Sequence, residues 1–129
     1  MRDPLLTRGM TIDRCVVDQV HASAFAVPTD APESDGTLEW DSTTIVVVEA
    51  RSGEEAGLGY SYTSSAAAAL VADLLQEAVV GSDAMDVPGA WLTMMRAIRN
   101  VGRPGVAASA IAAVDVALWD LKRGCWPCR

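Results

Sequence analysis

Residues 43–50 read Thr43-Thr44-Ile45-Val46-Val47-Val48-Glu49-Ala50, and no other run in the sequence is so clearly a strand. β-Branched residues dominate it, and their stiff side chains favour the extended backbone of a sheet. The central run from Ile45 to Val48 contains no polar residue, which indicates burial on both faces. We therefore expect a buried strand over residues 43–50.

Two further strands are predicted on either side of it. Residues Ile12–Val27 place small and branched apolar side chains on alternate positions, although Asp18 interrupts the pattern. After a turn at Ser52–Glu55, residues Gly57–Thr63 form a short return strand whose glycines allow another backbone to approach closely. The three segments predict an antiparallel meander.

The segment Pro28–Trp40 separates the first two strands and is rich in turn-forming residues. We expect a long loop here. Long loops without secondary structure of their own are often functional, and the alternative is a mobile hairpin tip without a role.

The rest of the chain predicts helices. The first covers Ala66–Val80, with Ser64 or Ser65 as its cap and Gly81 at its end. The second begins at the cap Asp86 and ends at Gly102, and the third begins at Pro104. Their apolar stripes are Trp91, Met94, Met95, Ile98 and Val101 in the second, and Ala107, Ile111, Val114, Leu118 and Leu121 in the third. The expected fold is α+β, a three-stranded antiparallel meander followed by a helical bundle.

Composition excludes several classes of protein. The chain has 129 residues, a formal net charge of −7 and 50% hydrophobic residues, so it is no disordered acidic tail. The acidic balance argues against binding to nucleic acid. No apolar run is long enough for a membrane span or a signal peptide. We expect a single cytoplasmic domain.

Chemically reactive side chains are few. The chain has one histidine, one lysine and no nucleophile-elbow, phosphate-loop or zinc-protease motif. Cys125 and Cys128 have C-x-x-C spacing, and Cys15 leaves an odd count. A small redox or zinc protein is therefore one alternative, although no second ligand pair accompanies the motif.

Three stretches together carry a family resemblance. They are Val27–Thr44, with Asp35-Gly36-Thr37-Leu38-Glu39-Trp40; Met95–Gly105, with Arg96-Ala97-Ile98-Arg99-Asn100; and Ala110–Lys122, with Asp115-Val116-Ala117-Leu118-Trp119-Asp120-Leu121. The chain from about Ile12 to Lys122 resembles the N-terminal capping domain of the mandelate racemase/muconate lactonizing enzyme group of the enolase superfamily.

The resemblance implies a cap over a (β/α) barrel. In that family the barrel carries the acid and base residues and binds the Mg²⁺ that stabilises an enediolate. Two cap segments close on a carboxylate substrate, a sugar acid or hydroxy acid, and they correspond here to Val27–Trp40 and Gly59–Ser64. The implied substrate-facing residues are Val27, Pro28, Thr29, Asp30, Asp35, Trp40, Tyr60 and Tyr62. Ordinary strand packing is an equal alternative for the two tyrosines.

The same resemblance makes the barrel a missing partner, since a barrel needs about 200 further residues. We therefore expect no catalytic residue and no metal ligand in the capping domain, residues 12–122. Residues 1–11 are expected to form a lead-in before it. Arg123–Arg129 is an unusual continuation of an apolar helix. With GC-rich codons and one added base, this tail reads Ala-Arg-Leu-Leu-Ala-Leu-Pro, so we hypothesise a frameshift or sequencing error.

Two other expectations remain open. Arg96, Arg99 and Arg103 recur at helical spacing, so a standalone module that binds a small anion is an alternative function. Alternatively, the three arginines form a face that docks on the barrel or on acidic loops.

A cap without its barrel exposes apolar surface, which predicts low solubility or self-association.

Overall fold

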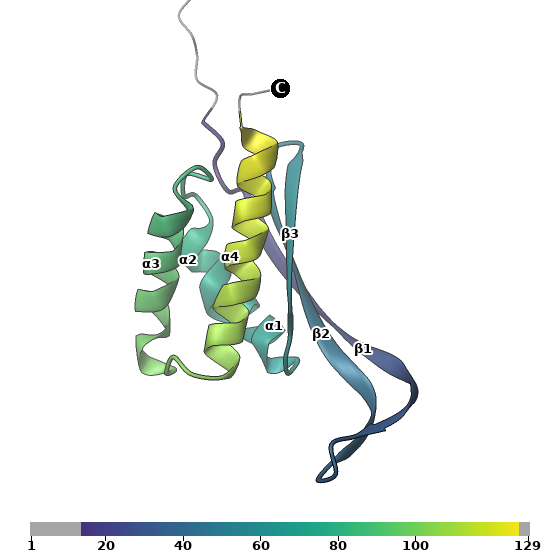
Figure 1. Ribbon diagram of the computed structural model, residues 1–129. Helices are drawn as coiled ribbons and strands as arrows, with labels where there is room; N and C mark the ends of the chain where they lie inside the picture. The colour runs from purple at the N-terminus through teal and green to yellow at the C-terminus, as the bar shows by residue number, and fades with distance from the viewer. Residues whose placement is uncertain (1–13, 127–129) are drawn as a thin grey trace, which may run out of the picture.

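The computed structural model describes residues 14–126, and its first layer is a three-stranded antiparallel sheet. The strands β1 (Gln19–Ser34), β2 (Glu39–Ser52) and β3 (Glu55–Tyr62) lie in sequence order, with β2 in the centre (Figure 1). The expected meander and the α+β class are confirmed. Residues 1–11, the expected lead-in, lie outside the described part of the chain.

Helices cover one face of this sheet (Figure 1). They are α1 (Ala66–Leu70), the π-helical turn η1 (Val71–Leu75), α2 (Gln76–Val79), α3 (Val87–Ala97), the 3₁₀ turn η2 (Ile98–Asn100) and α4 (Val106–Cys125). The single helix expected over 66–80 is wrong in its middle turn. A π turn has i→i+5 backbone hydrogen bonds in place of the i→i+4 bonds of an α-helix, and the spacing of apolar residues does not predict that difference.

The core lies between the covered face of the sheet and the inner sides of the helices, with α4 as its largest helical contributor. Val46, Val48 and Ala50 on β2 are fully buried. The five apolar positions expected on the last helix are all buried, which confirms that stripe: Ala107, Ile111, Val114, Leu118 and Leu121. In the second stripe Met94 and Ile98 are buried, but Val101 is exposed because the helix has already ended. The burial of Val47 expected from its apolar run is only partial, since the other sheet face is open.

The loop expected over Pro28–Trp40 is mostly strand. β1 begins later than expected, at Gln19, and continues through Ser34, with Glu33 paired to Trp40 across the hairpin. The register shifts between Pro28 and Glu33, so a bulge accommodates the prolines. β1 is an edge strand, where proline costs no ladder hydrogen bond. Turn-forming residues therefore mark a bulge here, and the true turn lies between Asp35 and Leu38.

Helix ends largely follow the expected capping. The Asp86 carboxylate accepts a hydrogen bond from the Gly89 amide at 3.1 Å, as expected for an N-cap. Ser64 Oγ accepts from the Ala66 amide at 3.2 Å. The last helix starts at Val106 instead of Pro104, because Gly105 adopts a φ of 75° that ends the preceding turn. No helix within residues 14–126 is long and apolar enough to cross a membrane.

Asp86→Ala is expected to lower the free energy of unfolding by about 1 kcal/mol, because the first turn of α3 loses its side-chain acceptor. Urea unfolding measures the change. Asp73→Ala is the control, since Asp73 is an exposed acid in η1 that caps no helix. Equal midpoints for the two variants would contradict a capping role for Asp86.

Candidate substrate-facing surface

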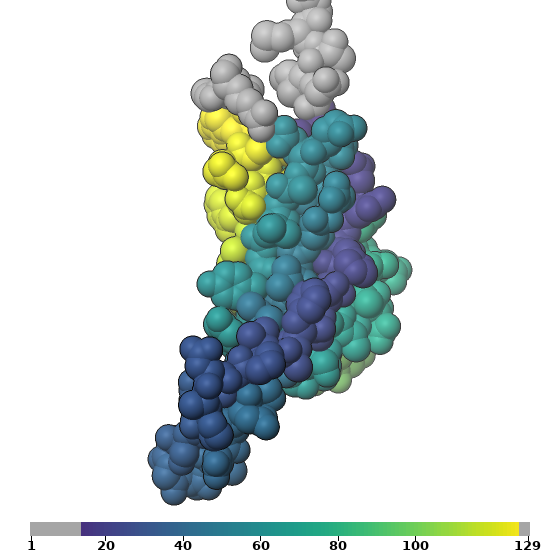
Figure 2. Space-filling model, turned by 90° about the vertical axis from the view of Figure 1, so that its right-hand side faces the viewer, coloured from purple at the N-terminus to yellow at the C-terminus, as the bar shows by residue number. Residues whose placement is uncertain are grey.

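The two segments expected to face substrate lie at one end of the molecule. The β1–β2 hairpin projects beyond the helices, and β3 ends beside its base before α1 begins (Figures 1 and 2). The Thr63 amide donates to the Thr44 carbonyl at 3.3 Å, which holds the β3 end against β2. Residues 30–42 are all exposed. The chain itself therefore buries almost nothing of the hairpin.

Inside the hairpin, side chains of the expected set stabilise its shape. The Asp35 carboxylate accepts from the amides of Thr37 and Leu38 at 2.8 and 2.9 Å, and these bonds lower the pKa of Asp35. Trp40 Nε1 donates to Glu33 Oε2 at 3.0 Å across the two strands. Asp35 and Trp40 thus have structural partners within the hairpin.

The remaining hairpin residues differ in exposure. Thr29 is half-buried and its hydroxyl donates to the Ala31 carbonyl at 2.7 Å. Val27, Pro28 and Asp30 are exposed.

Tyr60 and Tyr62 lie on the open face of the sheet. Their cross-strand partners are Val47 and Ile45, and their rings meet edge to face at 6.0 Å between centroids. The side chains of Tyr60 and Tyr62 are 60% and 68% exposed, so neither is packed into the core. Only Tyr62 lies near the hairpin end, because Tyr60 is two residues further back along β3.

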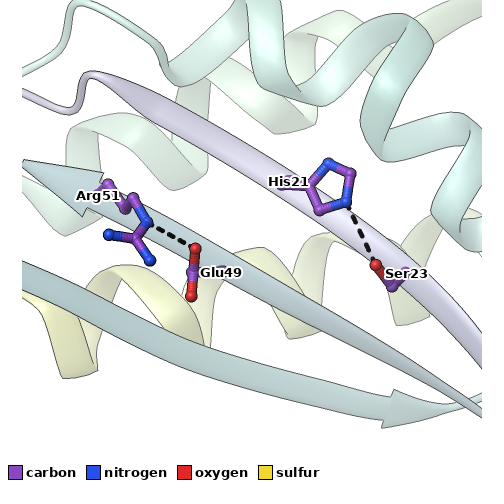
Figure 3. Close-up of polar contacts among 4 residues, drawn as sticks. All are labelled: His21, Ser23, Glu49 and Arg51. Atoms are coloured by element: carbon purple, nitrogen blue, oxygen red, sulfur yellow. Dashed lines mark hydrogen bonds and ion pairs between the residues drawn. The ribbon is translucent and has the colours of Figure 1, made fainter.

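The open sheet face also carries a feature that the sequence analysis missed. His21, Ser23, Phe25, Val47, Glu49 and Leu58 line a shallow hollow of about 190 Å³. At one end Arg51 Nε donates to Glu49 Oε1 at 2.6 Å, and the His21 ring and Ser23 hydroxyl share a hydrogen bond of 3.2 Å (Figure 3). Arg51 lowers the pKa of Glu49. Every second side chain of a strand faces the same side of the sheet, so selecting alternate residues of the three paired strands would have placed these residues together.

The three arginines of the alternative anion site do not share one helical face. Arg96 lies in the last turn of α3, Arg99 in η2, and Arg103 in the following loop. The expected i, i+7 spacing fails because the helical backbone of α3 and η2 ends at Asn100, before Arg103. The Arg103 guanidinium lies 5.9 Å from the centroid of the Trp91 ring, where it makes a cation–π contact.

The motif on α4 joins that helix to the sheet. An Asp120 carboxylate oxygen accepts from the Leu58 amide of β3 at 3.0 Å, and this bond lowers the pKa of Asp120. Lys122 Nζ donates to the Met85 carbonyl at 2.8 Å and lies 4.9 Å from the Trp119 ring centroid. Partial burial raises the pKa of Asp115. These contacts give the motif a structural role within this chain.

The Mg²⁺ implied by the family resemblance needs several oxygen ligands in octahedral geometry. Between Arg14 and Trp126, no group of three or more histidine, cysteine, aspartate or glutamate side chains converges as metal ligands. The described residues therefore do not provide the oxygen ligands that Mg²⁺ needs, and no chemical step through the ion is derived for them.

The C-x-x-C alternative rests partly on Cys128, which lies outside the described residues. Cys125 is half-buried at the last turn of α4, and burial together with a hydrogen bond to Cys15 raises the pKa of its thiol to about 12.

Comparison with known proteins identifies the class to which this fold belongs. Residues 19–124 match the family model of the mandelate racemase/muconate lactonizing enzyme N-terminal domain. The chain belongs to this family of enolase-superfamily capping domains.

Solved relatives share the fold over most of the chain. A mandelate racemase/muconate lactonizing enzyme-like protein from Rubrobacter xylanophilus is 53% identical, with a TM-score of 0.80 over 83% of this chain and 30% of its own. A racemase from Streptomyces coelicolor with bound magnesium is 33% identical, with a TM-score of 0.78 over 83% of this chain and 32% of its own.

Among curated relatives, the L-talarate/galactarate dehydratase of Salmonella typhimurium is 29% identical over 90% of this chain and 31% of its own length. The 3,6-anhydro-alpha-L-galactonate cycloisomerase of Streptomyces coelicolor is 32% identical over 83% of this chain and 31% of its own. The chain thus spans less than a third of these two relatives.

Proposed function

We propose that this chain is the substrate-selecting cap of an acid-sugar dehydratase, cycloisomerase or racemase, and that it has no turnover without a (β/α) barrel. The hairpin carries the proposal. Glu33 and Ser34 pair with Trp40 and Glu39 on either side of a hydrogen-bonded turn, yet residues 30–42 are all exposed. Ordering a segment costs conformational entropy. A hairpin held in one shape but left uncovered is suited to a surface outside this chain.

The residues of the proposed substrate surface are those at this end of the sheet. Val27, Pro28, Thr29 and Asp30 lie on the hairpin, Asp35 and Trp40 hold its shape, and Tyr62 ends β3 beside its base. Tyr60 has less support as a substrate-facing residue, because it lies further along β3 from the hairpin end of the sheet. The barrel supplies the acid and base residues and the Mg²⁺, and the substrate is a carboxylate such as a sugar acid.

The purified chain is expected to leave galactarate and talarate unchanged with or without Mg²⁺, because its described residues supply no converging metal ligands. Chromatography of the incubated acids measures any consumption.

Reading the genomic DNA after the codon for Arg129 in all frames is expected to show a barrel-encoding frame. Magnesium-dependent turnover by the chain alone would contradict the proposal.

The substrate-selecting role has its own test. The chain is fused to the barrel of the Salmonella dehydratase in place of the native N-terminal domain, and the hairpin tip between Thr29 and Leu38 is shortened to a two-residue turn. We expect KM for galactarate to rise about tenfold, since contacts worth about 1.4 kcal/mol are lost. Leu92→Ala on α3 is the control, and an unchanged KM in the shortened fusion would contradict substrate contact.

A further inference from the structure

Opposite charges are segregated on two surfaces of this chain. The projecting part of the β1–β2 hairpin, residues 30–42, carries five acidic residues and no basic one, and we call it the acidic arm. The connection between α3 and α4 has the opposite charge, since residues 87–114 contain three arginines and no aspartate or glutamate. These exposed arginines, Arg96, Arg99 and Arg103, form the arginine corner. The connection lies at the end of the molecule from which the hairpin projects (Figure 1).

The charges of the two surfaces do not neutralise each other within one chain. Among the interactions of residues 14–126, neither Glu39 nor Asp41 of the acidic arm forms an ion pair. The same holds for Arg96 and Arg99 of the arginine corner. Glu39 and Asp41 are alternate residues of β2, so their carboxylates face the same side of the hairpin. Neither belongs to the residues proposed above to face substrate.

Each surface also has an exposed apolar residue beside its charges. Leu38 is 69% exposed and directly precedes Glu39. Val101 is 57% exposed and lies between Arg99 and Arg103 in the sequence. Protein interfaces commonly place an apolar contact inside a rim of polar and charged groups. Leu38 and Val101 are suited to form such a centre, with carboxylates and guanidinium groups as its rim.

We propose that the acidic arm of one copy docks on the arginine corner of a second copy. Because both surfaces lie at one end of the molecule, a two-fold axis allows each copy to give its arm and to receive the arm of its partner, which closes the assembly at a dimer. The net charge of −7 repels two copies in most orientations, so pairing of the arm with the corner favours this one. The inference goes beyond the proposed function and does not rest on it.

Analytical ultracentrifugation of the whole chain tests the dimer. We expect a dimer at about 0.05 M salt, with a dissociation constant that rises at least about tenfold at about 0.5 M salt, because ions screen exposed charges. A chain that stays monomeric at the lower salt concentration would overturn the inference. Association that does not weaken in salt would also overturn it, since apolar contact through the open sheet face is expected to persist there.

Charge reversal locates the contact. Glu39→Arg with Asp41→Arg gives a basic arm, and Arg96→Glu with Arg99→Glu gives an acidic corner. Each double variant alone is expected to be monomeric, because both contacts of its dimer become repulsive. Mixed in equal amounts, the two variants are expected to form a heterodimer whose dissociation constant lies within about threefold of the original, since both contacts attract again. Only folded variants can restore the dimer in this way.

The matched control reverses two exposed acids outside both surfaces. Asp73→Arg with Glu77→Arg, on η1 and α2, makes the same change in net charge as the basic arm. This variant is expected to dimerise like the unmodified chain. With the acidic-corner variant it has one attractive and one repulsive contact, so it is expected not to draw that variant into a dimer. A dimer of either charge-reversed variant alone, or no heterodimer in their mixture, would overturn the inference.

Discussion

Gly59→Ala is expected to destabilise the domain by about 3 kcal/mol, the upper part of the range for overpacking. A β-carbon built on Gly59 collides with the carbonyl oxygen of Ala113 and the backbone nitrogen of Ala117, both on α4. Backbone atoms cannot rotate away as a side-chain end can. The whole helix must therefore move outward, and its buried residues lose contact with β2.

The control for this variant adds bulk to the same strand on its open face. Ala56→Val on β3 places its methyl groups where the side chain is exposed, so the change in stability is expected to stay within about 0.5 kcal/mol. Urea unfolding midpoints measure both variants. If Gly59→Ala unfolds at the same urea concentration as Ala56→Val, the close approach of α4 to β3 is contradicted.

Leu118→Ala is expected to lower the free energy of unfolding by about 3 kcal/mol. Leu118 is 1% exposed on the inner side of α4, and its removal leaves a cavity between the helix and the rest of the core. A domain of this size has a total stability of about 5–15 kcal/mol, so the loss is a large fraction of it.

Leu92→Ala is the matched control, because it removes the same atoms from a leucine on α3 that is 49% exposed. Its expected effect is below about 1 kcal/mol, since most of the side chain already contacts water. Thermal melts followed by circular dichroism compare the two. Similar losses from both leucines would contradict the assignment of the inner side of α4.

Among the groups whose pKa is shifted, Asp35, Asp120 and Cys125 illustrate how the stability of the domain depends on pH. Hydrogen bonds to amides lower the folded-state pKa of Asp35 and Asp120, so their contributions are present above the unfolded pKa and are lost as acidification passes through the folded pKa. Cys125 acts in the opposite direction. Its folded-state pKa of about 12 lies above the ordinary value of 9.0, so stability falls as pH rises through this window.

The elements of the fold were predictable where one physical signal acted alone. β-Branched residues over 43–50 predicted β2, and the apolar spacing from Ala107 to Leu121 predicted the buried side of α4. Prediction failed over Pro28–Trp40, where turn-forming residues indicated a loop. Pairing with β2 overrode those local preferences, because an edge strand tolerates proline and a bulge absorbs the extra residues.

The candidate surface was predictable in its segments but not in its side chains. Resemblance placed the hairpin and the end of β3 together, and they do share one end of the molecule. The roles of Asp35 and Trp40 within the hairpin depend on cross-strand contacts that local sequence does not show. The expected helical face of Arg96, Arg99 and Arg103 is not formed, because the helical backbone ends at Asn100, and periodicity alone could not locate that end.

Residue order alone established an α+β domain with an apolar central strand and an amphipathic last helix, because hydrophobic periodicity is a local property of the chain. Tertiary structure alone decided that Gly57 and Gly59 meet the backbone of α4 and that the outer sheet face stays open. Those features join residues far apart in sequence, and only packing in three dimensions brings such residues into contact.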